Sequence, residues 1–208
     1  MDNKTEQEFI KESNIEIITK LMNCNNGYIT SKLITELGIH RMYLNLMVEN
    51  NIIEKVGNGI YIDVTKYPDN YYILNINYQK TIYSHMTALY FHGLSIKAPD
   101  SNLDITVPKK YNVKELKKHN VFYVNDDIYD LGITEVETPM GNKVRCYDIE
   151  RCICDIIRSK NRMDIEHVKY SVRQYIKRKD KDLVKLSKYA DKLGNKDEIM
   201  NFISMMYE

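Results

Sequence analysis

The sequence contains no tryptophan, only four cysteines and four prolines among 208 residues, and almost no net charge, at +1. No apolar run approaches the roughly 20 residues needed to cross a bilayer, and the polar N-terminus lacks the apolar centre of a signal peptide. These absences predict a cytoplasmic protein without a membrane partner. The length is sufficient for one large domain or two modest ones with their own cores.

The four cysteines are not regularly spaced along the sequence, which argues against a disulfide framework. Cys152 and Cys154 lie two residues apart on an expected helix, and no histidine stands at a zinc-ligand distance from them in the sequence. We therefore expect free thiols, no metal and no cofactor. The four positions are Cys24, Cys146, Cys152 and Cys154.

Residues 28–63 organise the chain, because their order of two short helices, a tight turn and a β-hairpin is that of a winged helix-turn-helix. Thr30 and Ser31 precede an apolar run and offer hydroxyls to the unpaired amides of the first helical turn. Gly38 is expected to end this helix, since glycine adopts the left-handed conformation without a Cβ clash.

The second short helix, residues 40–50, is the candidate recognition helix. Its apolar residues, including Leu44 and Met47, recur at helical spacing and are expected to pack inward. The side chains expected to stay outside are those of Arg41, Tyr43 and Asn45. The two β-rich runs that follow, 52–56 and 60–63, flank a Gly-Asn-Gly turn and predict the wing.

A polar segment that contains Pro68 follows the wing, and the sequence pattern changes after it. We predict two domains, a winged helix-turn-helix domain at 1–66 and a C-terminal domain at 71–208. The fold class is α+β, and the C-terminal domain combines a small, mixed or antiparallel sheet with a helical bundle. Its expected strands are 71–75, 103–107, 121–124, 133–137 and 143–147. Its expected helices are 81–94, 113–118, 149–158, 164–178, 181–193 and 196–207, and Asp148 is expected to cap the third of them.

The net charge of the first 66 residues weakens the DNA-binding interpretation but does not exclude it. The first 66 residues carry seven basic side chains against nine acidic ones, a net of −2, whereas a phosphate-binding module is usually positive. A further helix is expected at 5–21, and four of its acidic residues can face away from a duplex: Glu6, Glu8, Glu12 and Glu16. The residues expected to contact DNA are Thr30, Ser31, Lys32, His40, Arg41, Tyr43, Asn45, Lys55 and Asn58.

The C-terminal half offers no convincing catalytic motif, so we expect a protein that is not an enzyme. It lacks a P-loop, an HExxH motif and a nucleophile elbow. His85 and His92 are about 10.5 Å apart along an ideal helix, too far to share one metal ion alone. Carboxylates at 126–127, Glu135 and Glu137 are interpreted as solvated loop groups.

Basic side chains crowd residues 158–181 and form a possible second charged surface. Four of them can share one side of a helix and the turn before it: Arg162, Lys169, Arg173 and Lys177. Such a stripe would suit phosphate or an acidic partner. Solvated charge on the surface of a helical bundle explains the same pattern equally well.

Three segments in this order resemble the AbiEi antitoxins of type IV toxin–antitoxin systems. They are ITSKLITELGIHRMYLNLMVENNIIEKVGNGIYI at 29–62, TIYSHMTALYFHGL at 81–94 and LDITVP at 103–108. The resemblance implies an antitoxin that is not an enzyme, with a winged helix that binds inverted repeats upstream of its own operon and represses it. It also implies a C-terminal domain that counteracts a nucleotidyltransferase toxin, with or without direct contact, and assists DNA binding, in abortive infection against phage. Relatives often carry several arginines in the recognition helix and wing, whereas Arg41 stands nearly alone here.

Three hypotheses remain open. The chain is a DNA-binding autorepressor and antitoxin, as the order of elements and the resemblance favour. Alternatively it is an antitoxin that acts by protein contact and whose winged helix no longer binds DNA, as the acidic balance favours. A nuclease or transferase that uses Asp104, Glu135 and Glu137 is disfavoured by the missing motif geometry.

Overall fold

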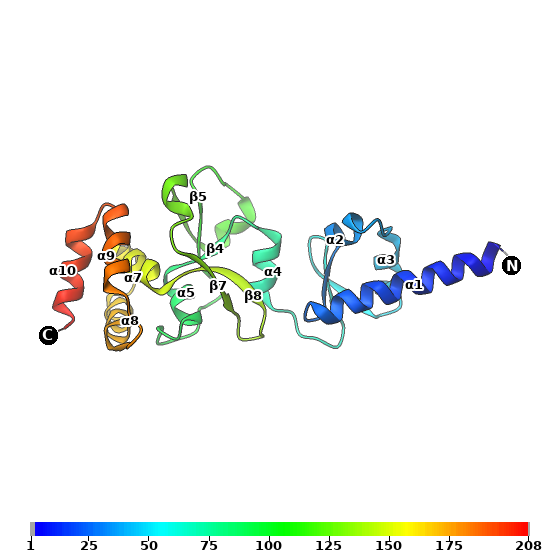
Figure 1. The fold of residues 1–208 in the computed structure, drawn as a ribbon, viewed down its shortest axis with the longest axis horizontal. Coiled ribbons are helices and arrows are strands. Elements are labelled where there is room, and N and C mark those ends of the chain that lie inside the picture. Colours follow the sequence, from blue (N-terminus) through cyan, green and yellow to red (C-terminus); the bar gives the residue numbers. More distant parts are fainter. Residues whose placement is uncertain (1–2, 208) are drawn as a thin grey trace. The chain divides into compact units, whose positions relative to one another are not determined.

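The computed structural model describes residues 3–207, with side chains from residue 14 onward, and the chain divides into two compact units, 1–77 and 78–208 (Figure 1). Each unit combines helices with one small sheet, so the protein has a mixed α and β architecture.

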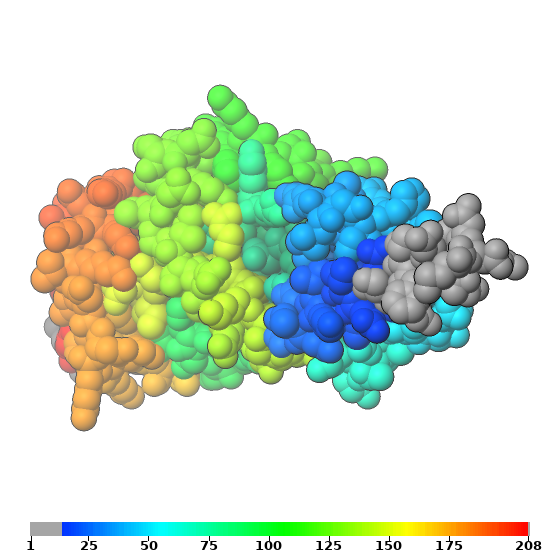
Figure 2. All heavy atoms as spheres, turned by 45° about the vertical axis from the view of Figure 1, so that its right-hand side comes forward, coloured from blue at the N-terminus to red at the C-terminus, as the bar shows by residue number. Residues whose placement is uncertain are grey.

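The first unit holds four helices and three strands within its described residues. They are α1 (Asn3–Cys24), β1 (Tyr28–Thr30), α2 (Ser31–Glu36), α3 (Met42–Glu49), β2 (Ile53–Gly57), β3 (Ile60–Asp63) and α4 (Asn70–Asn77). The strands form an antiparallel sheet in the order β1-β3-β2, so the first strand pairs with the last. In the surface view, the described part of α1 (dark blue) lies beside residues 30–50 (lighter blue) (Figure 2).

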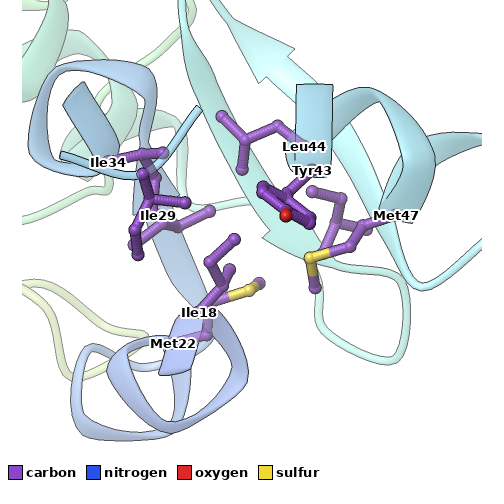
Figure 3. Packing of buried hydrophobic residues seen from close by; sticks show 9 residues of the cluster. Ile18, Met22, Ile29, Ile34, Tyr43, Leu44 and Met47 are labelled. Carbon is purple, nitrogen blue, oxygen red and sulfur yellow. The ribbon is translucent and has the colours of Figure 1, made fainter. Parts of the chain in front are cut away.

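Both faces of this small sheet are covered. One face packs against α1, α2 and α3 through a cluster that includes Ile18, Ile29 and Met47 (Figure 3). Ile62 on the other face belongs to a second cluster, which Ile73 of α4 completes. Because side chains alternate along a strand, three short strands can serve two cores.

Residues 71–75 were predicted as a strand, and this prediction is wrong because they lie in α4. The cause is a cap at Asp69, whose carboxylate accepts hydrogen bonds from the amides of Tyr71 (3.0 Å) and Tyr72 (3.2 Å). The Tyr28 hydroxyl in turn accepts from the Asp69 amide at 2.7 Å. Since α4 packs on the sheet of residues 1–77, it belongs to the first unit and not to the C-terminal one.

The second unit holds a five-stranded mixed sheet in the order β6-β5-β4-β8-β7. The strands are β4 (Ile82–Tyr83), β5 (Asp104–Pro108), β6 (Asn120–Val124), β7 (Ile133–Glu137) and β8 (Lys143–Tyr147). β4 and β8 are parallel, as are β5 and β6, whereas β4 with β5 and β7 with β8 are antiparallel. The sheet is therefore mixed, which is one of the two predicted alternatives, and the last four predicted strand positions agree with the structure.

The helices of the second unit follow the sequence prediction closely in the C-terminal part. They are α5 (His85–Phe91), η1 (Lys114–Lys118), α6 (Asp126–Tyr129), α7 (Ile149–Arg158), η2 (Lys160–Arg162), α8 (Ile165–Lys177), α9 (Leu183–Lys192) and α10 (Lys196–Met205). The helix predicted over 81–94 is shorter than expected, because its first residues pair with β5 and β8 as strand β4. Asp148 caps α7 as its sequence position indicated, accepting from the Arg151 amide at 2.9 Å.

Helix α7 is the centre of the second unit, since every residue from Glu150 to Ile157 is buried and α5, α8, α9 and α10 all contact it. Arg151 carries a guanidinium into this core. Its Nε donates to Asp155 at 2.9 Å, and its Nη1 donates to the carbonyls of Ile128 (2.7 Å) and Leu131 (2.9 Å). The guanidinium also lies 4.3 Å from the centroid of the Tyr147 ring.

Substituting Arg151 with methionine should destabilise the second unit, because Asp155 would lose its closest ionic partner inside the core. Removing one partner of a buried ion pair costs about 3–5 kcal/mol in the free energy of unfolding. Urea unfolding followed by circular dichroism measures this loss. The exposed Arg173 changed to methionine is the matched control, and a loss at Arg151 no greater than at Arg173 would contradict the assigned role.

Candidate nucleic-acid interface

The start of α2 is fixed against the turn that joins β2 to β3. The Thr30 hydroxyl accepts from the Leu33 amide at 3.2 Å and caps the helix, as predicted. The Ser31 amide donates to the Gly59 carbonyl at 2.8 Å. Gly59 has φ +67°, and a Cβ there would lie 2.3 Å from the Ser31 Oγ. Only glycine therefore allows the turn to approach α2 this closely.

The connection between α2 and α3 places two of the predicted DNA contacts in solvent. Gly38 takes φ +72° after α2, as expected, and Ile39 turns into the core. His40 is exposed, and its Nδ1 accepts from the Met42 amide at 3.2 Å. Arg41 is also exposed, and its Nε donates to the Thr35 hydroxyl at 2.9 Å. This bond orients the guanidinium and leaves its Nη donors free for a ligand.

Tyr43 was predicted to face outward on α3, and this prediction is wrong. Only 8% of its surface is exposed, and its ring lies in the same core cluster as Leu44 and Met47 (Figure 3). The inward stripe of α3 thus comprises positions 43, 44 and 47, because a wide apolar face includes neighbouring residues at helical spacing. Tyr43 cannot contact DNA from this position.

The solvent face of α3 carries Met42, Asn45 and Glu49, which are three and four residues apart. Met42 lies on this face, where Tyr43 was predicted to lie, and 46% of the Met42 surface is exposed. On the hairpin, Lys55 and Asn58 are exposed as expected. The structure therefore brings an arginine, an amide and a lysine to the surface of the helix pair and the hairpin.

The charge around this surface is mixed. Lys32 lies 3.8 Å from Glu36 in an exposed ion pair, and Glu49 and Glu54 are exposed as well. Glu16 is exposed on α1. The side chains of Glu6, Glu8 and Glu12 lie outside the described residues, so their predicted direction away from a duplex is untested.

The predicted basic stripe of the second unit lies partly on α8. Arg173 and Lys177 are exposed, and long side chains project from this region (orange in Figure 2). Lys169 is half-buried and pairs with Glu166 at 2.7 Å. Arg162 lies apart from α8, in η2, with its guanidinium 4.8 Å from the centroid of the Phe122 ring. Arg173 and Lys177 form no ion pair among the described residues, so two of the predicted four remain as a basic surface on α8.

The carboxylates considered for catalysis are not brought together. Asp104 is buried on β5, whereas Glu135 and Glu137 are exposed on β7, and two strands separate β5 from β7. Strands lie about 4.8 Å apart, so these groups are roughly 14 Å from one another across the sheet. Within residues 3–207 no group of three or more His, Cys, Asp or Glu side chains is placed to hold a metal ion.

Three of the four cysteines are buried in the second unit, and His92 is half-buried beside Cys146. The Nε2 of His92 lies 2.8 Å from the Tyr147 carbonyl, and burial lowers the pKa of His92. Cys146, Cys152 and Cys154 are buried free thiols, and Cys24 is an exposed one. Burial raises the pKa of Cys154 to about 12, which keeps this thiol protonated and inert at neutral pH.

Sequence reasoning missed a polar cluster around His85. The imidazole is 3% exposed and contacts two serines, Ser84 and Ser159, the second of which is 74 residues away. The only sequence signal was a histidine inside an apolar run, which more often marks a core residue. No spacing rule connects residues so distant in the sequence.

Comparison with known proteins adds little to this geometry. No family model matches the chain, and no curated protein matches it. Among solved structures it is similar to the crystal structure of the RV2827C protein from Mycobacterium tuberculosis, with 10% sequence identity and a TM-score of 0.48 over 92% of this chain and 81% of that chain. This similarity is too weak to assign a fold family or a function. No helix within residues 3–207 is both long and apolar enough to cross a membrane.

Replacing Tyr43 with alanine should lower the free energy of unfolding of the first unit by about 3 kcal/mol, because it empties a core position. Replacing the neighbouring Met42 with alanine should change it by less than about 1 kcal/mol, since that side chain is half in solvent. Chemical denaturation of the two variants checks the direction in which α3 faces. Equal losses would contradict the burial of Tyr43.

Proposed function

We propose that the chain is the antitoxin of a toxin–antitoxin system of the AbiEi type, and that it represses its own operon. In this proposal residues 28–63 form a winged helix-turn-helix that binds inverted repeats in the promoter DNA. The second unit counteracts a nucleotidyltransferase toxin. The proposal rests on the resemblance of three sequence segments to AbiEi antitoxins, together with the geometry of the first unit.

The observation that carries the proposal is the placement of β1, α2, α3 and the β2–β3 hairpin around one small sheet. The strand order β1-β3-β2 and the close contact between Ser31 and Gly59 set the hairpin turn beside the helix pair. This order of elements and pairing is typical of winged helices. It supports a DNA-binding mode in which α3 enters the major groove and the hairpin follows the adjacent backbone.

The exposed side chains have suitable chemistry for that mode. The guanidinium of Arg41 can donate two hydrogen bonds to a guanine, and the amide of Asn45 can pair with an adenine. Lys55 and Asn58 on the hairpin suit phosphate contacts, as does Lys32 at the start of α2. So few cations predict a modest affinity that depends on a small number of contacts.

A second candidate is supported by the charge and by Met42. The first 66 residues carry a net charge of −2, and the solvent face of α3 includes the carboxylate of Glu49 and a half-exposed methionine. Flexible methionines suit protein contacts. In this alternative the winged helix docks a protein, and the antitoxin acts by direct contact without binding DNA.

Binding to the DNA upstream of the gene tests the two candidates directly. Fluorescence anisotropy with the full chain should show specific binding that weakens as salt rises, and Arg41→Ala should reduce affinity by about 10- to 100-fold through the loss of a base contact. Lys188→Ala is a matched control, because this exposed lysine lies on α9 in the other unit. Equal binding to upstream and unrelated DNA would exclude the autorepressor and favour the docking module.

The basic surface of α8 has its own test. Changing Arg173 and Lys177 together to glutamate should lower operator affinity and reduce its salt dependence, if α8 assists DNA binding through phosphate contacts. The matched control changes Lys188 and Lys192, which are also exposed and four residues apart, to glutamate on α9. Equal effects of the two double variants would remove α8 from the interface and leave only a general effect of net charge.

A further inference from the structure

The second unit contains two adjoining hollows outside the proposed DNA interface. The larger has a volume of about 350 Å³ and is lined in part by Asp104, Asn120 and His167. The smaller has a volume of about 270 Å³ and is lined in part by His85 and Arg158. Phe122 and Arg162 line both hollows and form the wall between them. Volumes of this order are typical of small-molecule sites.

His85 lines the smaller hollow and has a strained backbone conformation. Its φ is +48°, in the left-handed region that non-glycine residues rarely adopt. The imidazole stacks on Phe122 with 3.5 Å between ring centroids, and its Nε2 lies 3.2 Å from the Ser159 Oγ. Strain of this kind persists only where the surrounding structure enforces it, and it clusters at functional sites.

The smaller hollow is positively charged. Arg158 and Arg162 both line it, and its one carboxylate, Asp155, lies between Arg151 at 2.9 Å and Arg158 at 3.6 Å. Arg162 forms no ion pair within the described residues, and its guanidinium lies over the Phe122 ring. Burial, together with the positive charges of Arg151, Arg162 and Arg158, holds the pKa of His85 well below its ordinary value. Neutral His85 and the hydroxyl of Ser159 therefore face two arginines with spare donors.

The larger hollow offers both hydrogen-bond acceptors and donors. The Asp104 carboxylate is nearly buried and accepts from the Asn120 amide at 2.9 Å and from the Met86 backbone at 3.0 Å. The Thr87 backbone also donates to this carboxylate, which leaves about one lone pair for a ligand, and Asn120 keeps its carbonyl oxygen and its second amide hydrogen. His167 lines the same space. These groups suit a planar, polar ring such as a nucleobase.

We propose that the two hollows together bind a mononucleotide. Its phosphate lies between Arg158 and Arg162 in the smaller hollow. The guanidinium of Arg162 can donate paired hydrogen bonds there, and Arg158 can donate from its Nη2, since its Nε already donates to Asn195 at 3.2 Å and its Nη1 pairs with Asp155. Its base lies in the larger hollow beside Asp104 and Asn120. Such a ligand would give the second unit a small-molecule site that is separate from promoter binding and from the proposed antitoxin role.

Isothermal titration calorimetry with the full chain tests this site. The probes are AMP, GMP, CMP and UMP, with inorganic phosphate and the corresponding nucleosides for comparison. At least one nucleotide should bind saturably below about 1 mM, and more tightly than its nucleoside or phosphate alone. Arg162→Gln should weaken it by about 10- to 100-fold, because a charge-assisted contact is lost. Lys188→Gln, an exposed change on α9, should leave it unaltered.

Amide chemical shifts of the unmodified chain locate the ligand independently of any variant. The nucleotide should perturb residues 120–124 and 158–162 and leave residues 31–59 unchanged. Three results would each overturn the proposal: no saturable binding by any nucleotide, equal affinity for inorganic phosphate and the nucleotide, or shifts confined to residues 31–59. Equal binding by Arg162→Gln and Lys188→Gln variants would overturn it as well.

Discussion

The guanidinium of Arg151 is fully buried at the centre of the second unit, and the surrounding elements supply partners for its Nε and Nη1, while its Nη2 has no hydrogen-bond partner among the described residues. Helix α7 supplies Asp155, the α6 region supplies two carbonyls, and β8 supplies the ring of Tyr147. Gly132 permits this arrangement, since it has φ +82° and a Cβ there would lie 2.9 Å from the Cβ of Arg151. A buried charge tolerates little rearrangement of its partners, so the contacts of Arg151 hold α6, α7 and β8 in one arrangement.

The same interaction shapes the charge of the neighbouring hollow. Asp155 is held by Arg151, and it is therefore only partly available to neutralise Arg158. Arg158 and Arg162 thus keep donors for an anion. The first unit follows a different rule, because an apolar cluster and not a buried charge decides which way α3 faces. Burying Tyr43, Leu44 and Met47 leaves Arg41, Met42 and Asn45 for a partner.

Local chemistry predicted most element boundaries. The caps at Thr30 and Asp148, the left-handed Gly38 and the hairpin at 53–63 follow from residue types that act within a few positions. The failures required distant partners. Residues 70–77 form a helix because Asp69 caps it and because it packs on a sheet formed by other parts of the chain. Which residues of α3 face inward depends on the elements that pack against this helix. The contacts of His85 join residues 74 positions apart, which no spacing pattern reveals.

The most direct test of the central proposal, DNA binding through α3, is the oxidation rate of Met42 in the full chain with and without the upstream DNA. Met42 is 46% exposed on the proposed contact face, while Met140 and Met205 are exposed to a similar degree, at 47% and 56%, in the other unit. Peroxide oxidation followed by mass spectrometry reports the access to each sulfur. The proposal predicts that bound DNA slows oxidation of Met42 and leaves Met140 and Met205 unchanged. Equal oxidation of Met42 in free and fully bound protein would contradict it.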